Sequence, residues 1–134
     1  MRRVSLLALA AGLVGIAGCA HPQAPEPPQT QTAGGLTISL TTSPSPPHTG
    51  DDTLIVTLTD AATGAPVGNA NMTGTAAAVA PQLPGVVNSG RAQGNGVYNI
   101  PTRLSIATTY DVTLKIQRTG QPETDVVFTI EAAQ

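Results

Sequence analysis

Apolar and polar residues alternate in several short stretches of the chain. A period of two is typical of β-strands that have one buried and one solvent-facing side. Segments rich in Gly, Pro, Asn and Ser separate these stretches, and such segments favour turns. The strands that the pattern predicts cover residues 36–41, 54–58, 69–77, 86–87, 97–100, 110–116 and 126–130.

About seven short strands in about 100 residues predict an all-β fold, an immunoglobulin-like β-sandwich. The composition agrees, because aromatic residues make up 2% of the chain and tryptophan is absent. Thr and Val, which favour strands, are abundant. The turn-forming segment from Arg118 to Pro122 predicts that the last two strands form a hairpin.

One tyrosine is expected to fasten this sandwich. A polar bend separates Leu104 from Tyr110, and Tyr110 then starts an alternating strand. The arrangement is similar to the tyrosine corner of immunoglobulin-like domains, in which the phenol bonds to the backbone just before it. We therefore assign structural roles to Tyr110 and Leu104. An exposed, partner-binding tyrosine is the alternative.

The first 18 residues have the pattern of an export signal. Arg2 and Arg3 precede an uncharged, largely apolar run from Val4 to Ala17. That run is shorter than the roughly 18 residues that a permanent membrane-spanning helix needs. We expect the segment to be cleaved after export.

The signal ends in Ile16, Ala17, Gly18 and Cys19, which resembles the lipobox of bacterial lipoprotein signals. The resemblance implies that the Cys19 thiol carries a diacylglycerol, that a peptidase cuts before it, and that the new amine often receives a further acyl chain such as palmitate. Cys19 is the only cysteine, so it has no internal disulfide partner. An ordinary signal peptide with an incidental cysteine, or an uncleaved buried helix, is the alternative.

These features divide the chain into three parts. Residues 1–18 are the signal peptide, residues 19–35 the lipidated cysteine and a Pro-rich linker, and residues 36–134 the sandwich domain. The linker contains four prolines and almost no large apolar residue. We therefore expect it to be disordered.

The charge balance argues against nucleic acid as a partner. The formal net charge is −2, and loss of Arg2 and Arg3 with the signal leaves four basic against eight acidic side chains. No basic patch remains to attract nucleic acid or anionic lipid. The expected partners are a membrane, through the N-terminal lipid, and a protein of the cell envelope. The expected location is the cell membrane or the outer membrane, with an extracytoplasmic domain that faces the periplasm in a two-membrane bacterium.

The domain is also similar to the YtkA-like family. The similarity is carried by Pro47–Gly50, Leu54–Leu58, Gly64–Val67, Ala70–Met72 and Gly96–Tyr98. It implies a small extracytoplasmic sandwich, of which some members accompany heavy-metal efflux or respiratory-oxidase assembly. This chain lacks the glycine that commonly precedes the aromatic residue of the penultimate strand, and most of the family's loop methionines.

No combination of side chains predicts an enzyme. His48 is the only histidine of the predicted domain, and its serine and aspartate neighbours share a Pro-rich turn without a nucleophile elbow. Asp51 and Asp60 stand at opposite ends of one strand, ~30 Å apart at about 3.3 Å per residue. That separation is too large for a catalytic carboxylate pair.

The predicted domain also has few candidate metal ligands. His48 and Met72 are weak candidates, one in a loop and one on a strand, and two ligands do not close a copper or zinc site. His48 with Asp51 and Asp52 gives at best a weak, exposed divalent site. We expect no cofactor.

Two functions follow from these observations. The first is a membrane-anchored, non-catalytic interaction module of the cell envelope. The second is an accessory protein in heavy-metal efflux or respiratory-oxidase metal handling, which the family resemblance alone implies.

Overall fold

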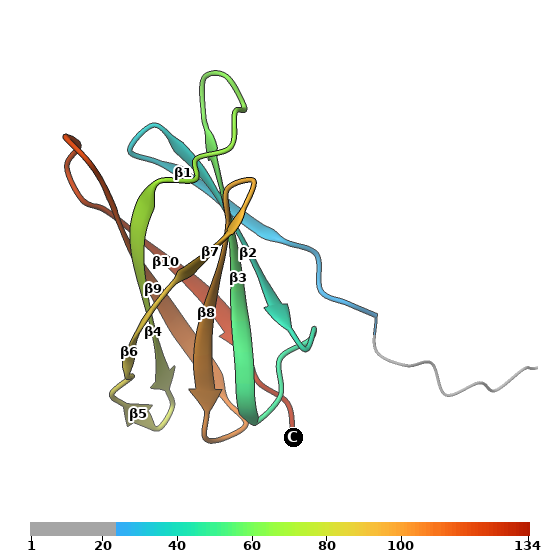
Figure 1. The fold of residues 1–134 in the computed structure, drawn as a ribbon. Coiled ribbons are helices and arrows are strands. Elements are labelled where there is room, and N and C mark those ends of the chain that lie inside the picture. The colour runs from blue at the N-terminus through green and yellow to red at the C-terminus, as the bar shows by residue number, and fades with distance from the viewer. Residues whose placement is uncertain (1–23) are drawn as a thin grey trace, which may run out of the picture.

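The computed structural model describes residues 24–134, which form ten strands in two antiparallel sheets of five strands each (Figure 1). The all-β sandwich predicted from the alternating pattern is confirmed. The strands are β1 (Gln29–Ala33), β2 (Leu36–Ser43), β3 (Gly50–Asp60), β4 (Ala70–Val79), β5 (Gln82–Leu83), β6 (Val87–Ser89), β7 (Arg91–Gly94), β8 (Val97–Leu104), β9 (Thr109–Arg118) and β10 (Thr124–Glu131).

The chain crosses between the sheets at three connections. The first sheet has the order β1-β2-β3-β8-β7, and the second has the order β10-β9-β4-β5, with β6 also paired to β4. The crossings are therefore the β3–β4, β6–β7 and β8–β9 connections. The predicted hairpin is confirmed, because β9 and β10 pair directly as antiparallel neighbours.

The number of strands is higher than the sequence predicts. The predicted strands correspond to β2, β3, β4, β6, β8, β9 and β10, and the structure adds β1, β5 and β7. The added strands have five, two and four residues, with mostly exposed side chains. An alternating pattern depends on one buried side, so it does not reveal short polar edge strands.

The core lies between the two sheets, where alternate residues of the long strands point inward. The only phenylalanine, Phe128, and both tyrosines, Tyr98 and Tyr110, are buried there among aliphatic side chains. Leu104 is fully buried at 0% exposure. Removal of this apolar surface from water is the main stabilising contribution to such a fold.

The amino-terminal boundary of the domain corrects the prediction of a linker that is disordered up to residue 35. Every residue of β1, from Gln29 to Ala33, pairs with β2. Gly34 and Gly35 make the turn between these strands with φ of 56° and 75°, a conformation that favours glycine. Polar β1 is held by main-chain pairing rather than by an apolar side, so composition alone suggested disorder. The folded domain starts at Gln29 and not at Leu36.

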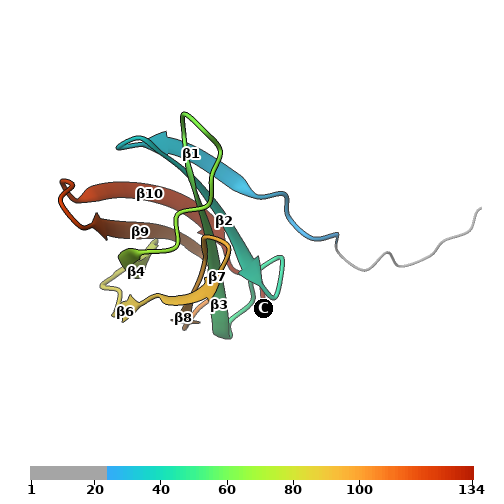
Figure 2. The ribbon, with the colours of Figure 1, turned by 45° about the horizontal axis from the view of Figure 1, so that its top comes forward.

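Both lateral edges of the sandwich are bridged between the sheets. On one side, β1 lies beside β10 (Figure 2), and the side-chain amides of Gln29 and Gln31 donate to the carbonyls of Thr129 and Val127 at 2.7 and 2.6 Å. On the other side, β6 and β7 form one continuous ribbon that passes from β4 to β8. These bridges occupy backbone groups that a free edge would expose.

Removal of β1 should destabilise the domain. We expect a chain that begins at Leu36 to have a free energy of unfolding at least ~2 kcal/mol below that of a chain that begins at Ala24, because each lost hydrogen bond contributes about 0.5–1.5 kcal/mol. Urea unfolding followed by circular dichroism measures this difference. The double change Gln29→Ala and Gln31→Ala isolates the share of the side-chain bonds. Equal stability of the two chains would contradict the assignment of β1 to the fold.

Candidate functional site

The inward side of β4 carries unusually short side chains. Met72 is followed at alternate positions by Gly74, Ala76 and Ala78, all turned toward the core. At Gly74 the side chain of Ile100 fills the space, since a Cβ there would stand 3.0 Å from the Ile100 Cδ1. Two packed sheets lie about 10 Å apart, so a pair of alanines does not span the layer between them.

A cleft of about 320 Å³ with a mixed polar and apolar lining opens at Ala76 and Ala78. Its opposite wall is the second half of β8, residues 101–103, which lies beyond the part that β7 pairs with. Leu83 of β5, residues 84–86 of the β5–β6 connection and Tyr110 also line it. The cleft is at the small end of the size range of ligand pockets.

Exposed apolar side chains are concentrated in the segment that contributes Leu83 and Val86 to this cleft. Of the five large apolar residues that are exposed in residues 24–134, four lie in residues 79–87. We call these four the apolar rim: Val79 (46% exposed), Leu83 (41%), Val86 (73%) and Val87 (63%). Gly85 holds the rim close to β4, because a Cβ there would meet the Ala76 carbonyl oxygen at 2.5 Å. Clustered exposed apolar residues mark interaction surfaces more often than single ones do.

The loop that carries the rim has no charge of its own, although Asp111 lines a hollow beside Val79 and Leu83. No charged residue occurs between Asp60 and Arg91 in the sequence. Arg103 stands in the cleft wall and pairs with Asp51 at 2.9 Å, with 71% and 84% of their side chains exposed. An ion pair this exposed contributes little to stability and its arginine stays accessible to a ligand.

Tyr110 lies where the predicted tyrosine corner would place it. Its hydroxyl donates to the carbonyl of Ile106 at 3.0 Å and accepts from the N–H of the same residue at 3.1 Å. Its ring is 4% exposed. These bonds hold the β8–β9 crossing between the sheets.

A second tyrosine does the same for the β3–β4 crossing. The hydroxyl of Tyr98 donates to the carbonyl of Val67 at 2.9 Å and accepts from the N–H of Ala70 at 3.1 Å. Sequence reasoning missed this role, because the bonded segment lies about thirty positions before Tyr98 and has no local motif.

The two tyrosines give a matched pair of stability tests. Tyr98→Phe and Tyr110→Phe should each lower the free energy of unfolding by about 1–3 kcal/mol, because each leaves a backbone donor and acceptor without a partner. Tyr110→Ala should cost about 3–5 kcal/mol, since it also removes the buried ring. Denaturant melts measure these values. A Phe variant within about 0.5 kcal/mol of wild type would mean that its hydroxyl does not fasten the crossing.

The weak metal candidates do not come together. Met72 on β4 is 4% exposed, and its partner on the neighbouring strand is Ile116, near the end of β9. His48 lies in the β2–β3 connection and bridges to Ala133, at the opposite end of the sandwich. Within residues 24–134, no three His, Cys, Asp or Glu side chains gather in a way that could hold a metal ion.

Asp51 and Asp52 are separated by the pleat of β3. Asp51 faces solvent, whereas Asp52 is 5% exposed and points inward, so the two carboxylates do not join His48 in the weak, exposed divalent site that was considered. One oxygen of Asp52, Oδ2, has no hydrogen-bond partner among the described residues. Burial raises the pKa of this carboxyl, and the backbone N–H and nearby charge of His48 oppose the rise only in part.

This burial should make stability depend on pH through Asp52. A folded-state pKa above the unfolded value means that the cost of burying the charge is fully present near neutral pH and is relieved as pH falls through the raised pKa. The stability of Asp52→Asn relative to wild type should therefore decrease between about pH 7 and about pH 4. Urea melts at both pH values test this, with Asp51→Asn as the solvent-facing control. A relative stability that does not change with pH for Asp52→Asn would contradict it.

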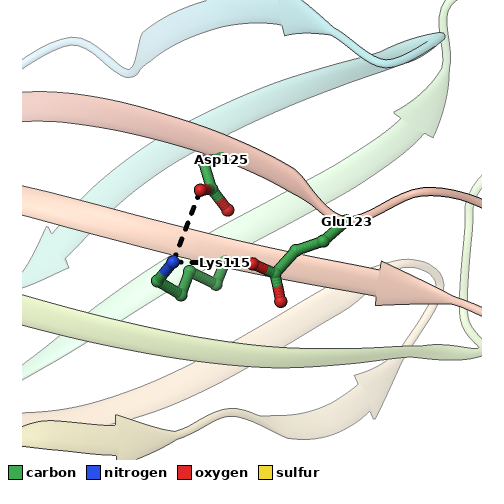
Figure 3. A network of polar contacts seen from close by, with 3 residues as sticks. All are labelled: Lys115, Glu123 and Asp125. Carbon is green, nitrogen blue, oxygen red and sulfur yellow. Dashed lines mark hydrogen bonds and ion pairs between the residues drawn. The ribbon is translucent and has the colours of Figure 1, made fainter.

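The strongest charge cluster lies elsewhere, on the outer face of the second sheet. Lys115 stands between Asp125 at 3.4 Å and Glu123 at 3.5 Å (Figure 3). The hydrogen bond and charge of Asp125, with a smaller effect of Glu123, raise the lysine pKa. All three side chains are about half exposed, so the cluster is a solvated face of the β9–β10 hairpin rather than a site.

Comparison with known proteins bears on the fold. No family model matches the chain, and no curated protein matches it. A crystal structure of a DUF4426 family protein from Pseudomonas aeruginosa PAO1 is similar, with a TM-score of 0.56 and 22% identity over 78% of this chain and 96% of that chain. The two proteins share a fold. The resemblance to YtkA-like domains stays a prediction.

The lipobox residues Ile16, Ala17, Gly18 and Cys19 lie outside the described residues, and their roles also stay predictions. Within residues 24–134, no helix is long and apolar enough to cross a membrane.

Sequence reasoning missed the cleft. An alternating pattern identifies alanine as a buried residue, but it does not show whether the small alanine side chain fills the space between the sheets. The feature of the sequence that could have indicated this site is the run without charged residues from Ala61 to Gly90.

Proposed function

We propose that this chain is a lipid-anchored, extracytoplasmic interaction module that acts without catalysis, and that the cleft and the apolar rim form its contact surface. The observation that carries the proposal is the concentration of exposed apolar side chains in residues 79–87, beside a cleft of about 320 Å³. Exposure of such groups is unfavourable in water, so their clustering favours a role in binding.

The amino-terminal sequence supports the anchored location. Cys19 follows an apolar run and two small residues, and it is the only cysteine of the chain. A lone thiol in an exported protein is accounted for by lipid attachment. Because Ala20 rather than Asp follows the cysteine, the lipobox resemblance permits outer-membrane sorting in a two-membrane bacterium.

The boundary of the folded domain shortens the tether. Within residues 24–134, the first hydrogen bond between the tether and the domain is at residue 26, where the N–H of Glu26 donates to the Ser45 Oγ at 2.9 Å. Six residues, 20–25, then separate the anchor from the domain. At no more than about 3.6 Å per residue they span ~20 Å, which keeps the module close to the membrane surface.

Lipid attachment is tested by a single atom change. Cys19→Ser should abolish incorporation of a labelled fatty acid, because the serine oxygen cannot form the thioether, and the uncut precursor should accumulate. Ala20→Ser adds the same hydroxyl one position later and should leave the label in place. Radiolabelling of the expressed protein, followed by gel analysis, distinguishes the two. A Cys19→Ser protein that still incorporates the fatty acid would overturn the anchor.

A further inference from the structure

The apolar rim lies at the same end of the sandwich as the anchor side of the chain. Glu26 bonds to Ser45 in the β2–β3 connection. The carboxyl-terminal strand end lies across this connection and the β8–β9 connection, since Ala133 donates to the carbonyl of Pro47 and Ala132 to the carbonyl of Thr108.

The same series of bonds reaches the rim. The Thr108 hydroxyl donates to the carbonyl of Ala80 at 2.7 Å, and Ala80 follows Val79, the first rim residue. One continuous end of the domain therefore carries both the attachment of the tether and the exposed apolar loop. The turn of residues 119–123 lies at the other end of β9 and β10.

The loop that carries the rim is uncharged, which suits contact with the apolar part of a bilayer. Residues 61–90 contain no charged side chain, so the loop loses no charge hydration when it meets lipid. Arg103 lines the cleft with 71% of its side chain exposed, and its present partner is the exposed carboxylate of Asp51 at 2.9 Å. A cation beside exposed valine and leucine suits an amphiphile that has a phosphate group and an apolar chain.

We propose that the apolar rim rests in the surface of the bilayer that holds the Cys19 lipid, with Arg103 at the level of the lipid phosphates. This inference depends on the proposed lipid anchor. A tether of ~20 Å brings the rim end within reach of the bilayer, and anchoring raises the local concentration enough for a modest apolar loop to bind. The rim then orients the sandwich on the membrane.

A probe at the rim tests this directly. Full-length Val86→Cys protein is purified after export, and the mass of its amino-terminal peptide reports whether Cys19 is acylated. An acylated Cys19 has no free thiol, so an environment-sensitive fluorophore labels position 86 alone. The labelled protein is inserted into vesicles of phosphatidylethanolamine and phosphatidylglycerol that contain a lipid-borne quencher.

Val127→Cys is the matched control, because Val127 is a half-exposed valine on β10, outside the rim. We expect a blue-shifted emission and strong quenching at position 86, and a water-like emission with weak quenching at position 127. Leu83→Asp in the Val86→Cys protein should remove the blue shift. Equal, water-like signals at both positions on acylated protein would overturn the inference and leave the anchor intact.

Two other outcomes also decide the matter. A probe at position 86 that is blue-shifted but not quenched by lipid indicates a protein partner or a second copy on the rim, and it overturns the bilayer contact. An amino-terminal peptide without acyl mass overturns the proposed anchor, and the inference with it.

Discussion

The structure depends on filling the space between two sheets with few large side chains. The chain has one phenylalanine, two tyrosines and no tryptophan, so aliphatic residues supply most of the packing. All three aromatic residues are buried, and the tyrosines also fasten two of the three crossings between the sheets. Where the layer receives Ala76 and Ala78 instead, it stays open as the cleft. The small number of large side chains therefore accounts both for the dependence of stability on the two tyrosines and for the open cleft.

The edge strands of the sandwich are covered by polar side chains and by main-chain pairing rather than by apolar side chains. Gln29 and Gln31 reach from β1 to the backbone of β10, and β6 and β7 carry the chain across the opposite edge. Only the lower part of that second edge, beside residues 101–103, lacks a paired strand. Two rim residues, Leu83 and Val86, line the cleft at this gap. The rim lies at the same end of the domain as the attachment of the tether. The incomplete packing of the core at this end is therefore where we propose that binding takes place.

The sequence was informative wherever one side of a strand is buried. Alternation predicted the long strands, and the spacing from Leu104 to Tyr110 predicted the bend to which the Tyr110 hydroxyl bonds. It failed for β1, whose Gln and Thr side chains resemble a linker, and for Tyr98, whose partner Val67 is distant in sequence. The cleft depends on side-chain volume across two sheets, and a single-chain pattern carries no information about the facing residue.

Hydrogen exchange on vesicles tests most directly whether the cleft end of the domain is its membrane-facing surface. The lipidated protein is compared with the lipidated double variant Leu83→Asp and Val86→Asp, both bound to vesicles of the same lipids. The account predicts that backbone amides of residues 79–87 exchange several-fold more slowly in the wild type than in the variant, while the distant turn at residues 119–123 exchanges equally in both. Equal exchange of residues 79–87 in the two proteins would contradict it.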